Sequence, residues 1–330
     1  MEFLRTQLSP LPTLKPYEVS TKTIVVTGAN VGLGFEAAAH FARLGPKKLI
    51  VTTRDAAKGQ DTVNRLVEAT GIARDNIEYR ELELSSFESV TKFAREYEKS
   101  GLSLDVLVES AGVAPDNYRP TGDGFDLTVQ VNVLSTFLLF FHLLPVLRKT
   151  ASQSPSPSPR AIIISSEVHY WVANPTASQL SISAFTKDPM ETNRYATSKL
   201  LEVLLVRHIA GLLATSKNPL DKRIITHTVN PGLCHSELMR ENDGWAVYLL
   251  KKAIARTGEQ GARNYVWAAL DEEAGRGERN GGYVSNMAFG RESEFVRSPA
   301  GKAMEPVVWN EIVRVLEEKT GPLDAIKDWN

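Results

Sequence analysis

A tyrosine and a lysine, Tyr195 and Lys199, lie four residues apart in the stretch 194–199, R-Y-A-T-S-K. If the stretch is helical, both side chains share one face, so an ammonium lies beside a phenol. Such a neighbour favours the phenolate, and the pKa of an unperturbed phenol is about 10. The pair therefore predicts a tyrosine that acts as acid or base near neutral pH. The alternative is an ordinary surface pair, because this spacing is common by chance.

Three glycines near the N-terminus, Gly28, Gly32 and Gly34, follow the apolar run 24–26, I-V-V. The run is typical of a buried parallel strand, and the apolar residues after Gly34 recur at helical spacing. Such a turn presents backbone N–H groups and a helix N-terminus to a pyrophosphate, with glycine wherever a Cβ would keep the phosphate away. The spacing G-x-x-x-G-x-G differs from the common G-x-G-x-x-G, so an ordinary strand-to-helix turn is the alternative. The stretch favours a dinucleotide.

Further strands and helices alternate along the chain and must position these two clusters. Their order predicts an α/β fold, a Rossmann-type doubly wound parallel sheet of about seven strands with helices on both faces, in a single domain. The Ser/Pro run 152–159 is expected to be an exposed loop and not a linker, since a strand follows at once. The predicted strands after the first are 48–53, 77–84, 104–108, 161–165, 224–229 and 282–287. The predicted helices after the first are 56–70, one starting at 85–88, 124–149, 200–213 and 245–270.

The composition limits the partners. Lysine and arginine number 38 against 39 acidic residues in 330, which gives no electrostatic reason to bind nucleic acid or an anionic membrane. The one cysteine, Cys234, excludes an internal disulfide and fits a reducing compartment. The first 22 residues have no continuous apolar run, so no signal peptide is expected and the location is predicted to be cytoplasmic. The apolar run 131–147 contains polar residues and is predicted to be a buried helix and not a membrane span.

Taken together, T-G-x-x-x-G-x-G and Y-x-x-x-K, in this order and at this separation, resemble the short-chain dehydrogenase/reductase family. The resemblance runs from about residue 23 to 283. Within this family, the chain resembles the branch that includes retinol-dehydrogenase-like proteins and carbonyl reductases of fungal secondary metabolism. It implies an N-terminal extension (1–22), a Rossmann-type catalytic domain (23–290) and a C-terminal tail or helix (291–330). It also implies a nicotinamide cofactor and no metal.

The resemblance assigns four catalytic roles. Tyr195 is similar to the general acid that protonates a substrate carbonyl oxygen, and Lys199 to its partner, which also contacts the nicotinamide ribose. Ser166 resembles the hydroxyl that orients the carbonyl, with its neighbour Ser165 as the competing assignment. Asn132 resembles the residue that holds a helix bulge and a proton-relay water; the alternative for it is a packing asparagine. Donors aimed at the oxygen would stabilise charge where it develops.

The end of the second strand favours NADP(H) over NAD(H). Thr53 occupies the position where a carboxylate would bind the ribose 2′-OH, and Arg54 follows it with a planar guanidinium that suits a 2′-phosphate. Asn30 resembles NADP-type members, whereas Asp55 is more simply a helix N-cap. Glu83 replaces the usual aspartate near adenine, and Glu109-Ser110 departs from the usual Asn-Asn. The cofactor-binding residues implied are Gly28, Asn30, Val31, Gly32, Leu33, Gly34, Arg54, Glu83, Leu84, Ser110, Ala111, Gly112, Tyr195, Lys199, Pro231, Gly232, Leu233 and Ser236.

Substrate contacts are expected in two places. Ser166 and Tyr195 are 29 positions apart, which leaves a long insertion, 167–194, beside the chemistry. A second variable region, 237–270, follows the sixth strand. Aromatic and apolar side chains from both would line an apolar pocket, or would only pack the insertion onto the domain. The pocket residues named are His169, Trp171, Trp245 and Tyr248.

The sequence thus predicts an NADPH-dependent reductase of a hydrophobic ketone or aldehyde, or the reverse alcohol dehydrogenase, acting on a secondary-metabolite intermediate. A non-redox isomerase, dehydratase or cyclase on the same fold is the first alternative, and a nucleotide-sensing interaction protein is the second. The resemblance to the family also implies a homodimer, in which the two chains pair through the helices at 124–149 and 195–213.

Overall fold

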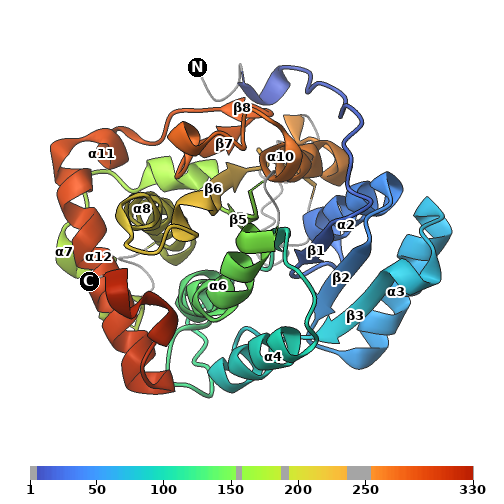
Figure 1. The fold of residues 1–330 in the computed structure, drawn as a ribbon. Coiled ribbons are helices and arrows are strands. Elements are labelled where there is room, and N and C mark those ends of the chain that lie inside the picture. The colour runs from blue at the N-terminus through green and yellow to red at the C-terminus, as the bar shows by residue number, and fades with distance from the viewer. Residues whose placement is uncertain (1–5, 154–157, 187–192, 236–253, 330) are drawn as a thin grey trace.

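The central sheet has the strand order β3-β2-β1-β4-β5-β6-β7-β8 (Figure 1). The computed structural model describes residues 6–153, 158–186, 193–235 and 254–329. All neighbouring strands are parallel except β7 and β8. The predicted doubly wound fold is confirmed, with a short antiparallel edge strand added to the seven expected. The strands are β1 (Thr23–Val26), β2 (Lys48–Thr53), β3 (Ile77–Glu81), β4 (Val106–Glu109), β5 (Arg160–Ile164), β6 (Ile225–Asn230), β7 (Tyr283–Ser285) and β8 (Ala288–Phe289).

Helices cover both faces of the sheet. In Figure 1, α4, α6 and α8 lie on one side, and α2, α3 and α10 lie on the other. Each layer encloses its own hydrophobic core, as expected for right-handed crossovers. The α-helices are α2 (Gly32–Leu44), α3 (Ala56–Thr70), α4 (Phe87–Lys99), α5 (Leu127–Val129), α6 (Thr136–Gln153), α7 (Ala177–Leu180), α8 (Arg194–Thr215), α10 (Gly258–Leu270), α11 (Glu294–Arg297) and α12 (Pro299–Thr320). Shorter turns are η1 (Arg74–Asn76), η2 (Gln130–Ser135), η3 (Glu167–Trp171), η4 (Ile182–Thr186), η5 (Asp221–Arg223), η7 (Gly277–Arg279) and η8 (Asp324–Trp329).

The helix α3 begins and ends where the sequence predicts. Asp55 caps its N-terminus, because the carboxylate accepts a hydrogen bond from the backbone N–H of Lys58 at 2.8 Å. Gly71 ends it with φ of 73°, a left-handed conformation that favours glycine. The interpretation of Asp55 as an N-cap is therefore confirmed, and Arg54 is left exposed at the end of β2.

The single helix predicted over 124–149 consists of three parts. The short α5 leads into η2, which is a π-helix, and α6 continues from it. A π-helix widens the turn by one residue and is often found at functional sites. Together these parts form a helix, Leu127–Gln153, that is long and apolar enough to cross a membrane. Because 89% of its most apolar window is buried inside the fold, it is the core helix that the sequence predicts.

The C-terminal residues 294–329 belong to the body of the protein. The helix α12 packs against α8, and η8 packs against α6. Trp309 of α12 is 2% exposed and meets Phe141 of α6 edge to face, with ring centroids 5.5 Å apart. The same chain therefore covers part of α6 and α8, and the expected pairing of two chains through these helices stays a prediction.

The segment before β1 is also attached to the body. The Gln7 side chain donates to the backbone oxygens of Leu233 (2.8 Å) and Ile254 (2.9 Å). Tyr17 donates to the Asp271 carboxylate at 3.0 Å, which anchors the segment to the residue after α10. The N-terminal extension thus lies against the loop that follows β6.

Candidate active site

The glycine turn between β1 and α2 is shaped by close contacts. Gly28 has φ of 63°, and a Cβ there would lie 2.8 Å from the Ala111 Cα. A Cβ on Gly34 would lie 2.4 Å from the Gly28 carbonyl oxygen. Val31, the N-cap of α2, makes no side-chain capping bond, so no side chain of the N-cap covers the first-turn N–H groups. The turn therefore fits a phosphate group that approaches the helix N-terminus closely.

Ser166 and Tyr195 meet at the carboxyl end of β5. Ser166 follows this strand and caps η3, while Tyr195 lies in the first turn of α8. The Ser166 hydroxyl lies close enough to the Tyr195 phenol to lower the pKa of the phenol, although burial outweighs this effect. The competing residue, Ser165, is 2% exposed and donates its hydroxyl to the Lys199 backbone oxygen at 3.0 Å. This geometry favours Ser166 as the serine that faces the tyrosine.

Lys199 lies one helical turn beyond Tyr195, with its ammonium nitrogen 5.5 Å from the centre of the tyrosine ring. The ammonium donates to the Ile164 backbone oxygen and to the Glu202 carboxylate, both at 2.8 Å. Burial raises the pKa of Tyr195 above its ordinary value, and the negative charge of Glu202 raises it further. Because Glu202 holds the ammonium, it opposes the lowering of this pKa that is expected from Lys199, and the part of Lys199 in tuning the tyrosine stays a prediction.

Asn132 is fully buried in the π-helix η2. Its side-chain oxygen accepts from the Val113 backbone N–H at 2.9 Å, and its amide donates to the Val113 oxygen and the Ser198 hydroxyl, both at 3.0 Å. Asn132 thus joins the widened helix to α8 and to the loop after β4. The helix bulge that the resemblance implies is present at this residue, and its part in proton relay stays a prediction.

The other cofactor positions lie at the same edge of the sheet. A Cβ on Gly112 would lie 3.4 Å from the Asn132 side-chain oxygen and 3.8 Å from the Lys199 nitrogen. Thr27 joins this loop to the glycine turn, because its hydroxyl accepts from the Ala111 backbone N–H at 3.1 Å. Glu83 is half-buried, and its carboxylate accepts from the Ser85 N–H at 2.9 Å. The loops after β1 and β4 therefore meet, and the loop after β4 lies near Asn132 and Lys199.

The loop after β6 contains the next three predicted cofactor residues, Pro231, Gly232 and Leu233. The Leu233 backbone N–H donates to the Gln7 side chain at 3.0 Å, and Gly232 has φ of 79°. Cys234 is 6% exposed, and burial raises its pKa to about 12, so its environment is that of a small packing residue and not of a reactive thiol.

Two predictions for this region cannot be placed. Ser236, the last cofactor position, lies outside the described residues. Two of the named pocket residues, Trp245 and Tyr248, also lie outside them.

The insertion before α8 mostly packs onto the body. Leu180, Ile182 and Phe185 belong to the core beneath α8 and α12. His169 is fully buried, its Nδ1 lies 2.7 Å from the Ser166 backbone oxygen, and its Nε2 accepts from the Ser293 N–H. Its assignment to the substrate pocket is therefore wrong, because both ring nitrogens are used within the fold. Trp171 is 66% exposed, and its substrate contact stays a prediction.

Two buried histidines should make the fold sensitive to acid. Burial lowers the pKa values of His169 and His227 to about 4. The unfolded chain takes up these protons below about pH 6.5, whereas the folded chain takes them up only near pH 4. Stability is therefore full above pH 6.5 and falls as the pH drops toward 4, by about 2 kcal/mol per histidine at pH 5.

Thermal unfolding of the protein and of His169→Gln, compared between pH 8 and pH 5, measures this loss. Glutamine can replace both hydrogen bonds without titrating, so the variant should lose less stability in acid. An acid dependence unchanged in both His169→Gln and His227→Gln would contradict the prediction.

Two carboxylates of the site were not assigned from the sequence. Glu202 was missed, although its spacing of three residues from Lys199 is a recognisable helical pair. Glu109 was seen only as a departure from the family pattern, and it is buried at 3% exposure. Among the described residues, no group of three or more His, Cys, Asp and Glu side chains could hold a metal ion.

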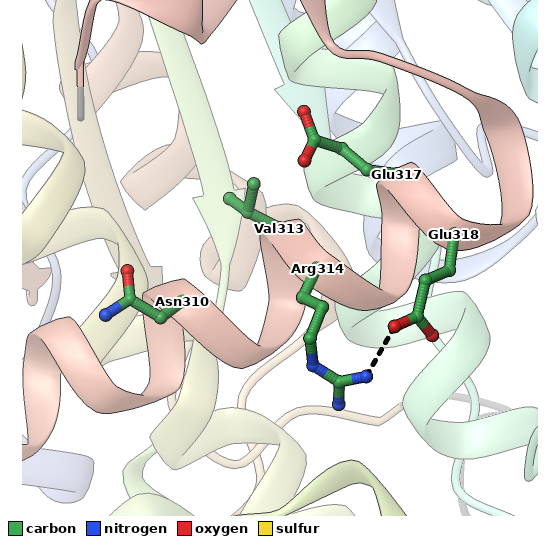
Figure 2. A pocket seen from close by; sticks show the side chains of 5 residues that line it. All are labelled: Asn310, Val313, Arg314, Glu317 and Glu318. Carbon is green, nitrogen blue, oxygen red and sulfur yellow. Dashed lines mark hydrogen bonds and ion pairs between the residues drawn. The ribbon is translucent and has the colours of Figure 1, made fainter.

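A surface depression elsewhere is separate from this site. Figure 2 shows that its lining side chains, including Arg314 and Glu318, all come from α12. It is open to solvent, and Arg314 is paired with Glu318 at 2.7 Å. The residues that could do chemistry lie instead at the carboxyl edge of the sheet.

Comparison with known proteins defines the family. The family model for short chain dehydrogenases matches residues 22–169. The chain is 39% identical to the short chain dehydrogenase/reductase dmxR8 of Cryptosporiopsis sp. over 337 aligned positions, which cover 99% of this chain and 98% of the relative. The protein therefore belongs to the short-chain dehydrogenase/reductase family of oxidoreductases, as its motifs indicate.

Solved structures share the fold. The NADP complex of Pseudomonas aeruginosa RhlG matches with a TM-score of 0.63 at 24% identity, over 82% of this chain and 97% of that one. The NADPH-bound carbonyl reductase from chicken fatty liver matches with a TM-score of 0.59 at 19% identity, over 84% of this chain and 96% of that one.

Proposed function

We propose that the protein uses NADPH to reduce a ketone or aldehyde on a hydrophobic small molecule, or catalyses the reverse alcohol oxidation, with Tyr195 as general acid or base. The observation that carries this proposal is the approach of the Ser166 hydroxyl to the Tyr195 phenol, one helical turn before Lys199, at the sheet edge where the glycine turn ends. A carbonyl oxygen placed between the two hydroxyls would receive two hydrogen bonds. The phenol would then give its proton to this oxygen as negative charge develops.

The cofactor site fits a dinucleotide. The glycine turn, the uncapped start of α2 and the loop at Gly112 would hold it, and a bound nicotinamide supplies the hydride. Lys199 would donate to the ribose hydroxyls, and Asn132 would keep the widened helix in position behind it. Two proteins that share the fold were solved with NADP or NADPH, which supports the choice of nucleotide.

Substrate and cellular setting rest on the resemblance and on chemistry. We expect a polyketide- or terpenoid-like intermediate of secondary metabolism, bound by apolar side chains of the insertion and of the region 237–270. A cytoplasmic location is consistent with the buried free cysteine.

The direct test follows NADPH absorbance with a panel of hydrophobic ketones and aldehydes, with product detected by mass spectrometry. NADPH oxidation matched by alcohol formation supports the proposal. Product without cofactor oxidation would instead identify an isomerase, dehydratase or cyclase. Nucleotide binding with no product from any substrate would favour a nucleotide-sensing protein.

Arg54→Ala should raise the KM for NADPH by about tenfold or more and change the KM for NADH little. The reason is that the exposed guanidinium after β2 would pair with the 2′-phosphate, which NADH lacks. Steady-state kinetics with both cofactors measures the two constants. Arg314→Ala, which removes an exposed arginine on α12, is the matched control and should change neither. Equal effects of Arg54→Ala on NADPH and NADH would reject the 2′-phosphate role.

A further inference from the structure

Two buried carboxyl groups lie behind the lysine of the active site. Glu109 ends β4, and Glu202 lies on α8 three residues after Lys199. Their residues are 3% and 1% exposed. Buried carboxyl groups are costly unless they are paired or neutral, so their arrangement near a catalytic lysine calls for an explanation.

Glu202 holds the Lys199 ammonium. One carboxylate oxygen accepts from the ammonium at 2.8 Å, and the two side chains are 2% and 5% exposed. The ammonium also donates to the Ile164 backbone oxygen, which fixes it against the end of β5. The second Glu202 oxygen has no hydrogen-bond partner among the described residues.

Glu109 lies close enough for the charge of Glu202 to raise its pKa, after the larger effect of burial. Neither of its carboxyl oxygens has a hydrogen-bond partner within the described ranges. Burial also raises the pKa of Glu202, to about 7, and the Lys199 charge opposes this rise. Of the two carboxyl groups, Glu202 is the one paired with a cation, so negative charge is favoured on Glu202 and disfavoured on Glu109.

The groups that act on Glu202 come from three elements. Lys199 and Tyr195 lie on α8, Glu109 lies on β4, and the Tyr265 phenol faces them from α10. Of these groups, only Lys199 is a cation. The Glu202 carboxylate therefore offsets the positive charge of Lys199 and weakens the effect of that charge on the tyrosine.

We propose that Glu202 is a positioning residue that holds the Lys199 ammonium and offsets its charge, with the buried Glu109 carboxyl behind it, so that the Tyr195 phenol ionises at higher pH than it would beside an unpaired lysine. This inference rests on the proposed function, because it concerns the proton that Tyr195 gives to the carbonyl. Carbonyl reduction would keep its rate well above pH 7, and alcohol oxidation would need strongly alkaline solution.

The experiment compares pH profiles of kcat/KM for reduction, from about pH 5 to pH 10, in the protein and in Glu202→Gln. Glutamine keeps the shape and removes the charge, so Lys199 should act on the phenol without compensation. The unchanged protein should keep its rate to about pH 10, whereas in Glu202→Gln the alkaline fall should begin about one to two pH units lower, within the measured range. Glu202→Asp, which keeps the charge, should restore most of the original profile. Glu109→Gln should leave it in place, because burial and the charge of Glu202 favour the neutral form of Glu109.

The matched control is Glu305→Gln, which breaks another ion pair of α8, with Arg207 at 2.8 Å. It should not move the pH profile. A correctly folded Glu202→Gln that binds NADPH and has an unchanged profile would overturn the inference, as would a large shift in Glu109→Gln.

A separate readout does not depend on turnover. Ultraviolet absorbance of tyrosinate, titrated with pH and compared with Tyr195→Phe, reports the ionisation of Tyr195 directly. It should occur at lower pH in Glu202→Gln than in the unchanged protein. If no carbonyl is reduced, the proposed function fails while this titration still tests the inference; an unchanged titration would overturn it.

Discussion

Replacing Tyr195 by phenylalanine is expected to lower kcat for carbonyl reduction by about 10²–10⁴-fold, because it removes the proton donor alone. The ring remains to fill the space beside Lys199 and Ser166, so folding should be unaffected. NADPH affinity should stay within about threefold, because the glycine turn and Arg54 are untouched. Steady-state kinetics gives kcat, and fluorescence titration gives the Kd for NADPH.

The matched control for this variant is Tyr79→Phe, which removes a phenol hydroxyl from β3 at the far edge of the sheet. It should retain full activity. Turnover near the original rate in Tyr195→Phe would eliminate Tyr195 as the acid. A loss of turnover caused only by weaker NADPH binding would reassign the residue to the cofactor site.

The order of strands could be predicted because each has a local signature. The run Lys48–Thr53 is apolar and β-branched, and it forms β2 with the predicted bounds. Asp55 and Gly71 mark the two ends of α3 with short-range contacts that need no tertiary information. The predicted end of the third strand, at residue 84, is wrong: β3 ends at Glu81, and Leu82 and Leu84 are buried in the loop that follows the strand. Burial alone does not distinguish a strand from a packed loop.

The state of the tyrosine could not be predicted from one pair. The spacing of Tyr195 and Lys199 indicates proximity, but the sign of the effect depends on every charge nearby. Glu202 opposes the expected effect from the same helix, and Glu109 adds to the arrangement from β4, far away in the sequence. The combined effect of these charges on the pKa of Tyr195 can be worked out only when the fold shows which of them lie near the tyrosine.

The substrate region shows the same limit. An aromatic-rich insertion predicts either a pocket or a packed lid, and composition does not separate them. His169 became a packing residue through Ser293, which is 124 positions later in the chain. The contact could not be predicted from local pattern, whereas the burial of Leu180 and Phe185 follows from ordinary hydrophobic packing.

Gly34→Ala should have the second large effect, a loss of NADPH affinity on the order of a hundredfold. The added Cβ would lie 2.4 Å from the Gly28 backbone oxygen and 3.2 Å from the Ser110 hydroxyl. A backbone oxygen cannot rotate away, so the turn must shift and its N–H groups must leave the phosphate. Fluorescence titration with NADPH measures the loss, and kcat at saturating cofactor should fall less than the affinity does.

The control for this substitution is Gly211→Ala in α8, where a Cβ would meet nothing within 4 Å. Alanine favours a helix over glycine by about 1 kcal/mol, so this variant should bind NADPH normally and unfold at the same or a higher temperature. If Gly34→Ala binds NADPH as tightly as the unchanged protein, the turn does not cradle the phosphates. The dinucleotide must then bind elsewhere, because a turn displaced by backbone overlap cannot keep the same contacts.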